Sequence, residues 1–257
     1  MNDAAPGLIS TLSPAPRGVV FDYGNTLIPF GQHEMDTISA ALVRFVAAHL
    51  PDATQDDIAV ALRDAMTRLH RQRMETNRES DPRDVIRLAF RALGAEADEG
   101  DHVEPGVGVI LDTFVTSVRS APDSALVLGE LRRRGYRLGL LSNYSLAAVI
   151  RDSLDRLGLT EYFDLVVVSA DLGLLKPDPE LFLETARRIE LDPADILYVG
   201  DNLRADIEGA FGAGMRTAHI TEHLGGAYFF EHRDENRADV SPDLTLGRLR
   251  DLTHGDI

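Results

Sequence analysis

Four short, continuously apolar runs constrain the fold of this chain more than any other feature. Each run ends at polar residues, as is typical of a strand buried on both faces that meets a turn. The runs cover residues 18–21, 138–141, 165–168 and 196–199. Segments with apolar residues at helical spacing cover 124–134, 146–157, 179–189 and 203–213. With a fifth strand expected at 217–220, this alternation predicts a doubly wound α/β fold, a parallel sheet with helices on both sides.

The stretch between the first two predicted strands breaks this alternation. It contains no convincing strand, and its apolar residues recur at helical spacing, which predicts roughly four helices. The helix-forming groups are Leu42, Phe45 and Val46, then Ile58, Leu62, Met66 and Leu69, then Val85, Leu88, Ala89 and Leu93. We therefore expect an all-helical subdomain over 30–121, inserted into an α/β core made of 17–29 and 122–257.

The two ends of the chain are predicted from weaker patterns. Residues 1–16 contain three prolines and little periodicity, which indicates a flexible lead-in. The tail over 223–257 is polar, and we expect a short helix in it near 245–252.

The amino-acid composition excludes several classes of function. The chain has 42 acidic and 26 basic residues and a formal charge of −16, so it repels nucleic acid and anionic lipid surfaces. The absence of cysteine excludes disulfides, thiolate metal sites and cysteine nucleophiles. No apolar run reaches the ~20 residues of a membrane-spanning helix, and the start lacks a secretory signal. We expect a cytoplasmic protein with a small-molecule partner, and the oligomeric state stays open.

Polar residues follow the predicted strands at the edge where ligands bind in open α/β sheets. Asp22, Ser142, Asn143 and Asp201 follow three of the strands, and Lys176 lies in a proline-rich loop. Two carboxylates suit Mg²⁺, a hydroxyl with N–H groups holds phosphate oxygens, and an ammonium offsets phosphoryl charge. The set favours phosphoryl transfer. Taken singly, each residue also has a common structural use, as a turn former, a helix cap or a surface charge.

Four ordered motifs carry a family resemblance. Phe-Asp-Tyr-Gly-Asn-Thr-Leu at 21–27, Leu-Ser-Asn at 141–143, Lys-Pro-Asp-Pro at 176–179 and Gly-Asp-Asn-Leu-Arg-Ala-Asp at 200–206 resemble those of the haloacid dehalogenase-like hydrolase superfamily. The helical insert also resembles the cap that this superfamily carries after its first motif. The resemblance covers nearly all of the chain beyond the lead-in, and it implies a Rossmann-like core and a phosphatase activity.

The resemblance implies a role for each matching residue that acts on the phosphoryl group. Asp22 is the expected nucleophile, which forms an aspartyl-phosphate that water then hydrolyses. Ser142 and Asn143 are the expected phosphate-binding residues. Lys176 is expected to hold the nucleophile and the phosphate together.

The resemblance also implies a magnesium site. Its expected ligands are the carboxylates of Asp22 and Asp201 and the backbone carbonyl of Gly24. Asp206 is expected to orient the metal shell, and Thr26 is expected to support the first loop.

Gly24 departs from the family pattern, because the phosphatases usually carry a second aspartate there as general acid. Glycine keeps the carbonyl for the metal but has no proton to donate. Substrates with a leaving group of low basicity need that proton least. The candidates for a replacement proton donor are His33, Glu34 and the region 70–73.

Two other functions stay open. One is a weak or inactive phosphate- or metal-binding regulator that lost its chemistry at Gly24. The other is a 2-haloacid dehalogenase, since these enzymes resemble the chain in nucleophile and fold. They work without metal and replace the carboxylate found here at Asp201, which favours phosphate as the substrate.

A basic cluster stands out in this acidic chain. It consists of Arg68, Arg71, Arg73 and Arg78. The cluster is expected to pair with Glu75 and Glu79 on a solvated helix face. The alternative is that it meets a second anionic group of the substrate.

Overall fold

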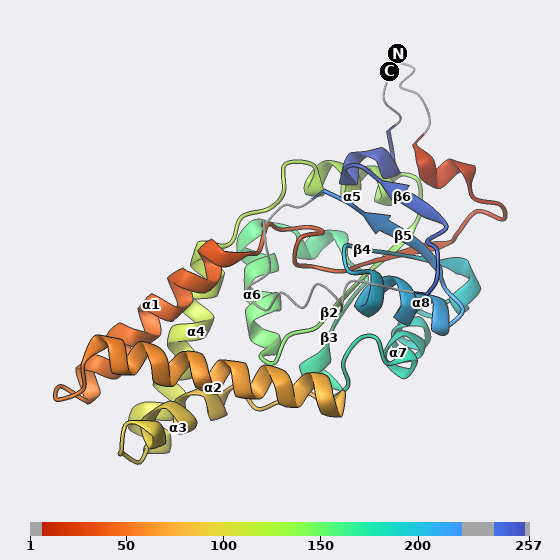
Figure 1. The fold of residues 1–257 in the computed structure, drawn as a ribbon. Coiled ribbons are helices and arrows are strands. Elements are labelled where there is room, and N and C mark those ends of the chain that lie inside the picture. Colours follow the sequence, from red (N-terminus) through yellow and green to blue (C-terminus); the bar gives the residue numbers. More distant parts are fainter. Residues whose placement is uncertain (1–6, 223–238, 255–257) are drawn as a thin grey trace.

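A six-stranded parallel sheet lies at the centre of the computed structural model, which describes residues 7–222 and 239–254 (Figure 1). The strand order is β3-β2-β1-β4-β5-β6. The strands are β1 Gly18–Phe21, β2 Arg137–Ser142, β3 Leu165–Val168, β4 Ile196–Gly200, β5 Arg216–Ile220 and β6 Leu244–Leu246. The first four lie where the apolar runs predict them, β5 lies where a fifth strand is expected, and the predicted α/β class is confirmed.

Helices cover both faces of the sheet. Side chains alternate between the faces of a strand, so Val19 and Phe21 of β1 pack on one side and Val20 on the other. Helices α5 (Ser124–Arg133) and α6 (Ala147–Leu157) cover the first side. Helix α7 (Pro179–Ile189) and the stretch formed by η6 (Leu203–Glu208) and α8 (Gly209–Gly212) cover the second.

Strand register brings the polar strand ends to one level. Phe21 pairs with Leu140 on one side and with Val199 on the other, and the Asp22 N–H donates to Val199 O at 2.9 Å. The chain runs from β1 outward to β3 and then returns to the other side of β1, so the strand order reverses between β1 and β4. Ligands bind at such a reversal in doubly wound sheets.

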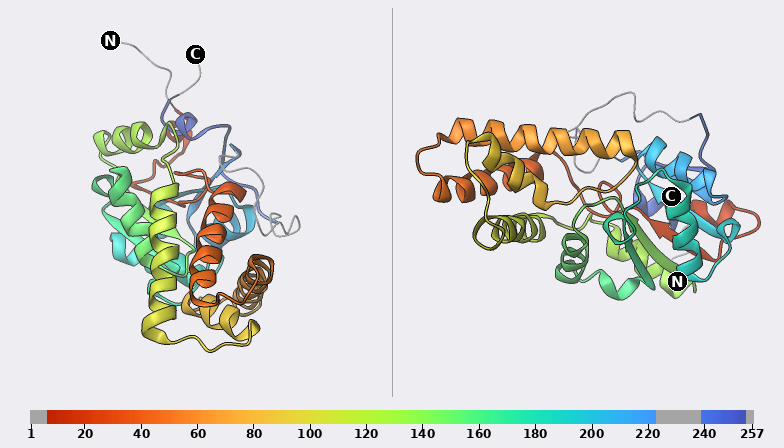
Figure 2. Two further views of the ribbon diagram at one scale, coloured as in Figure 1. Left: turned by 90° about the vertical axis from the view of Figure 1, so that its left-hand side faces the viewer. Right: turned by 90° about the horizontal axis from the view of Figure 1, so that it is seen from below.

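The insert between β1 and α5 is helical, as predicted. Its helices are α1 Gln32–His49, α2 Gln55–Thr76, α3 Arg83–Ala92 and α4 Glu104–Ser117, with the short helical segment η2 Glu99–Val103 before α4. These helices lie together beside the core, and the views of Figure 2 show the same grouping. The chain segments that enter and leave the insert meet at Leu27, whose carbonyl accepts from Ala121 N at 2.9 Å and from Ser124 Oγ at 2.7 Å.

Both ends of the chain differ from the expectation within the described residues. In the expected flexible lead-in, residues 8–11 form a short 3₁₀ helix, and Ile9 is fully buried in the core. In the tail, Leu244–Leu246 pairs with β5, and the helix expected near 245–252 is only a 3₁₀ turn at Leu249–Leu252. The parts of these segments at 1–6, 223–238 and 255–257 lie outside the described residues.

Over 7–222 and 239–254, no helix combines the length and the apolarity needed to cross a membrane.

Candidate active site

Lys176 lies at the centre of a buried polar cluster at the carboxyl ends of β1 and β4. Its Nζ donates to Asp22 Oδ1 at 2.6 Å, to Asp206 Oδ1 at 2.7 Å and to the Tyr198 hydroxyl at 3.1 Å. Burial opposes its charge, but Asp206 and Asp22 outweigh burial and hold the pKa of Lys176 well above its usual range. The side chain is therefore a positioned ammonium.

Three carboxylates lie close together at this site. One oxygen each of Asp22, Asp201 and Asp206 lies within 4.8 Å of the others. Burial raises the pKa of Asp22 to about 6 against the opposing charge of Lys176, and burial together with Asp206 and Asp22 raises the pKa of Asp201 well above its usual range. With all three ionised, the set carries two more negative charges than Lys176 neutralises. An all-oxygen set with this excess fits a hard dication such as Mg²⁺.

Asp206 is committed to hydrogen bonds inside the protein. Its Oδ1 accepts from Lys176 and from the Tyr198 hydroxyl at 3.2 Å, and its Oδ2 accepts from Asn202 N at 3.0 Å. Gly200 makes room for this side chain, since a Cβ at 200 would lie 2.4 Å from the Asp206 carboxyl carbon. Both oxygens of Asp206 are thus occupied.

Asn143 contacts the main chain of Lys176. Its Oδ1 accepts from Lys176 N at 2.9 Å, and its Nδ2 donates to Lys176 O at 3.1 Å. The predicted phosphate-binding side chain therefore clamps the residue that bears the ammonium. Ser142, also predicted to bind phosphate, is buried at the end of β2.

The loop after Asp22 is held by Asn25. This residue has a left-handed backbone (φ 56°), and its Oδ1 accepts from Phe30 N at 3.1 Å. Gly24 pairs with Ile28 in the same loop. Thr26 is fully buried, and its hydroxyl has no hydrogen-bond partner. Its supporting role stays a prediction.

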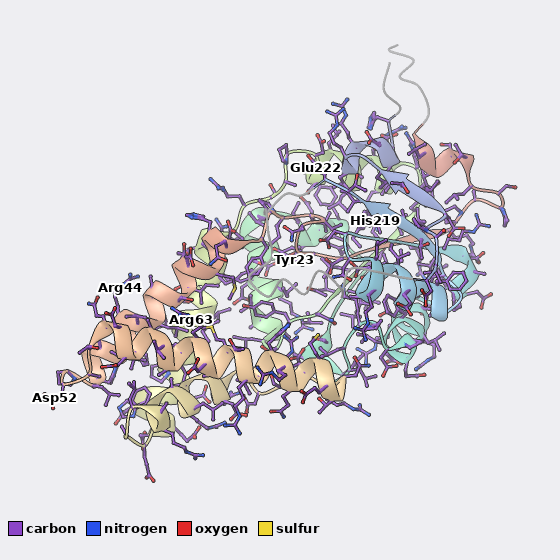
Figure 3. The ribbon with its side chains drawn as sticks, in the orientation of Figure 1. Tyr23, Arg44, Asp52, Arg63, His219 and Glu222 are labelled. Atoms are coloured by element: carbon purple, nitrogen blue, oxygen red, sulfur yellow. The ribbon has the colours of Figure 1, made fainter. Side chains whose placement is uncertain are left out.

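Tyr23 anchors the residue after the predicted nucleophile to the core. Its hydroxyl and Ser153 Oγ on α6 form a buried hydrogen bond of 2.7 Å. Burial raises the pKa of Tyr23 to about 12, so the phenol stays protonated at neutral pH. Figure 3 labels this side chain between the insert and the sheet.

Residues 16–214 match the profile of the family described as haloacid dehalogenase-like hydrolase. The chain belongs to the haloacid dehalogenase-like hydrolases. The family predicted from the four motifs is thus confirmed, and in this hydrolase Asp22, Asn143 and Asp206 of those motifs contact Lys176.

Several known proteins are similar to this hydrolase over half or more of its length. This hydrolase is 31% identical over 240 residues to a glyceraldehyde 3-phosphate phosphatase of Methanopyrus kandleri, covering 92% of this chain and 95% of that one. It is 36% identical over 131 residues to a phosphoserine phosphatase of Thermus thermophilus, covering 51% and 49%. Among solved structures, a 2-haloacid dehalogenase of Pseudomonas syringae pv. Tomato DC3000 superposes with a TM-score of 0.67 at 26% identity, covering 91% and 95%.

Sequence reasoning missed two residues of this site. Tyr198 reads as part of an apolar strand, yet its hydroxyl bonds Lys176, Asp206 and the carbonyl of Leu141, the last at 3.1 Å. The available signal was a phenol in a strand buried on both faces, because a buried hydroxyl needs a partner. His219, labelled in Figure 3, lies with Nε2 3.0 Å from the carbonyl of Asp201.

The lysine content of the chain is a second sequence signal for this site. Lys176 is the single lysine of this hydrolase, beside 25 arginines. An ammonium is compact and donates in three directions, whereas a guanidinium is a flat fork. A cation enclosed by three acceptors therefore favours lysine even in a chain that uses arginine everywhere else.

The predicted replacement proton donors lie in different surroundings. Glu34 is buried, and its Oε2 accepts from Gly31 N at 2.9 Å, which caps the start of α1. His33 is exposed in the same turn. In the region 70–73, Arg73 pairs with Glu79, as predicted for the basic cluster. This pair is not solvated as expected, because the Glu79 side chain is only 6% exposed.

Proposed function

We propose that this hydrolase is a Mg²⁺-dependent phosphatase of a small phosphorylated metabolite, with Asp22 as its nucleophile and the helical insert as its cap. The observation that carries the proposal is the contact of Lys176 with Asp22 and Asp206, with Asp201 close by. The names of the relatives, phosphatases of glyceraldehyde 3-phosphate and of phosphoserine, support the substrate class.

In the first step a carboxylate oxygen of Asp22 attacks phosphorus, and the bond from phosphorus to the leaving oxygen breaks. The product is an aspartyl-phosphate and the freed alcohol, whose oxygen takes its proton from solvent. Lys176 holds Asp22 at 2.6 Å and offsets the charge that two anions bring together. Asn143 maintains that position through the main chain of Lys176.

In the second step the oxygen of a water molecule attacks phosphorus, and the bond from phosphorus to the Asp22 oxygen breaks. The Asp22 carboxylate is regenerated, inorganic phosphate leaves, and the water's protons stay on the phosphate or pass to solvent. Asp22 and Asp201, with the carbonyl of Gly24, would hold Mg²⁺. When bound, the ion neutralises phosphoryl charge. Asp206 keeps Lys176 in place, since both of its oxygens are engaged in the protein.

A phosphatase screen tests the function. Purified protein is assayed on an aryl phosphate, sugar phosphates, nucleotides and acyl phosphates, with Mg²⁺ and with a chelator. We expect phosphate release from at least one small monoester or acyl phosphate, and at least a tenfold lower rate with chelator, because the acidic cluster then lacks its cation. Mg²⁺ binding with no hydrolysis across the panel would favour the regulator instead.

Gly24 predicts which leaving groups are preferred. A Cβ at 24 would meet only the Phe30 Cβ, at 3.7 Å, so a side chain is sterically admissible there. We expect Gly24→Asp to raise kcat on alkyl phosphates more than on aryl phosphates, by about tenfold or more in the ratio, because general acid catalysis is worth ~10²–10⁴. The Gly24→Asn variant, of equal size but with no acidic proton, is the control. An equal ratio change in both variants would exclude leaving-group protonation as the cause.

Dehalogenation is the second candidate, favoured by the 26% identity to the 2-haloacid dehalogenase structure. Metal-independent release of halide from 2-haloacids would identify it. We place it second because of Asp201, which lies within the acidic cluster. A reaction that needs no metal does not require this additional carboxylate.

A further inference from the structure

Glu79, which follows helix α2 of the insert, reaches into the core. Its side chain is 6% exposed, and its Oε2 accepts a hydrogen bond from Ser169 Oγ at 2.5 Å. Its main chain is also engaged, since Glu79 N donates to Gly173 O at 3.2 Å and Arg78 forms an antiparallel bridge with Leu174. Figures 1 and 2 show the later end of α2 approaching the segment after β3.

The charge of Glu79 is matched within the insert. Arg73 Nε lies 2.7 Å from Glu79 Oε1, and its Nη2 donates to Oε2 at 3.0 Å. A carboxylate this buried requires such a partner. The ion pair therefore allows the insert to present an acceptor to Ser169 without an uncompensated charge.

Two short paths lead from Glu79 to the site. Ser169 Oγ accepts from Tyr144 N at 2.9 Å, and Tyr144 follows Asn143, which clamps the main chain of Lys176. On the second path, the segment at 173–174 that pairs with residues 78–79 lies just before Lys176. Glu79 is thus linked to both segments that carry site groups, to the first through its carboxylate and Ser169 and to the second through its main chain.

We propose that Glu79 is a positioning residue, which couples the seating of the helical insert to the placement of Lys176 and Asn143. The proposal rests on the proposed function for its kinetic consequence. The predicted effect on the position of Lys176 does not depend on the proposed function, because the contacts of Glu79 involve no substrate.

The kinetic test uses Glu79→Ala, Ser169→Ala and the double variant, with an aryl phosphate as the probe. We expect each single variant to lose about tenfold to a hundredfold in kcat, since small displacements of positioned groups cost that much. The double variant should be close to the slower single variant rather than to the product of the two losses, because both changes remove the contact between Glu79 and Ser169. Glu79→Gln, which keeps an oxygen for Ser169, should retain more activity than Glu79→Ala.

The control is Glu99→Ala, which removes an exposed ion pair with Arg87 inside the insert. We expect wild-type kcat. An equal loss in Glu99→Ala and Glu79→Ala would overturn the proposal, because it would indicate general damage to the insert. Fully multiplicative effects of Glu79→Ala and Ser169→Ala would also overturn it.

A chemical readout separates this proposal from the proposed function. Lys176 is the only lysine, so acylation of a lysine side chain, followed by mass spectrometry, reports on this position alone. Glu79→Ala and Ser169→Ala should each speed acylation of Lys176 at least tenfold, and Glu99→Ala should not, because freeing the loop exposes the ammonium. If wild-type protein hydrolyses no phosphate, the proposed function fails while this result still decides the role of Glu79. Unchanged acylation in both variants would reject that role.

Discussion

Replacing Asp22 with asparagine is expected to lower turnover of a phosphate ester by about 10⁴- to 10⁶-fold, as removal of a nucleophile does in other hydrolases. The amide keeps the size of the side chain and an oxygen for Lys176, which lies 2.6 Å away. It lacks the anionic oxygen that attacks phosphorus. The measurement is single-turnover and steady-state phosphate release in Mg²⁺.

Two controls make this result specific. Thermal unfolding should show that Asp22→Asn stays folded, and Asp64→Asn, a change of an exposed aspartate on α2, should leave turnover at the wild-type level. Activity of Asp22→Asn within tenfold of wild type would eliminate the aspartyl-phosphate mechanism.

Replacing Lys176 with methionine is expected to remove turnover and to lower the free energy of unfolding by about 3–5 kcal/mol, the usual cost of leaving a buried charge without its partner. The variant leaves Asp22 and Asp206 without the ammonium that contacts both. Denaturant unfolding in the presence of chelator measures the stability loss.

The pH dependence of this loss has a defined sign. The pKa of Asp22 is already raised to about 6, with Lys176 as an opposing influence, so removing the lysine raises it further. The folded variant then binds protons that the unfolded chain has released, and its stability falls as pH rises from about 4 through the raised pKa. The loss should be larger at pH 8 than at pH 5. An equal loss at both values would contradict the electrostatic cause.

Lys176→Arg distinguishes charge from shape in the same experiment. It keeps the positive charge, but a forked guanidinium does not fit between the three acceptors that surround Nζ. We expect turnover to stay at least about 10²-fold below wild type. Recovery to wild-type turnover would show that charge alone is required.

The layered fold was predictable from the sequence because the local pattern of apolar residues shows which faces of each strand and helix are buried. Runs such as 18–21 and 196–199 are apolar at every position, and a strand of this kind requires cover on both faces. The strand-end rule then placed Asp22 and Asp201 at the same edge before any contact was known. The strand at Leu244–Leu246 was missed because three residues are too few for a period to be recognised.

The contacts within the site depended on tertiary structure. The sequence identified Asn143 and Lys176 as polar residues at the same edge, but only the folded chain joins the amide of one to the main chain of the other. Glu79 and Ser169 are 90 positions apart and have no shared pattern. Sequence periodicity determines which faces are buried, whereas the pairing of distant polar groups is decided by strand register and by how the insert docks on the core.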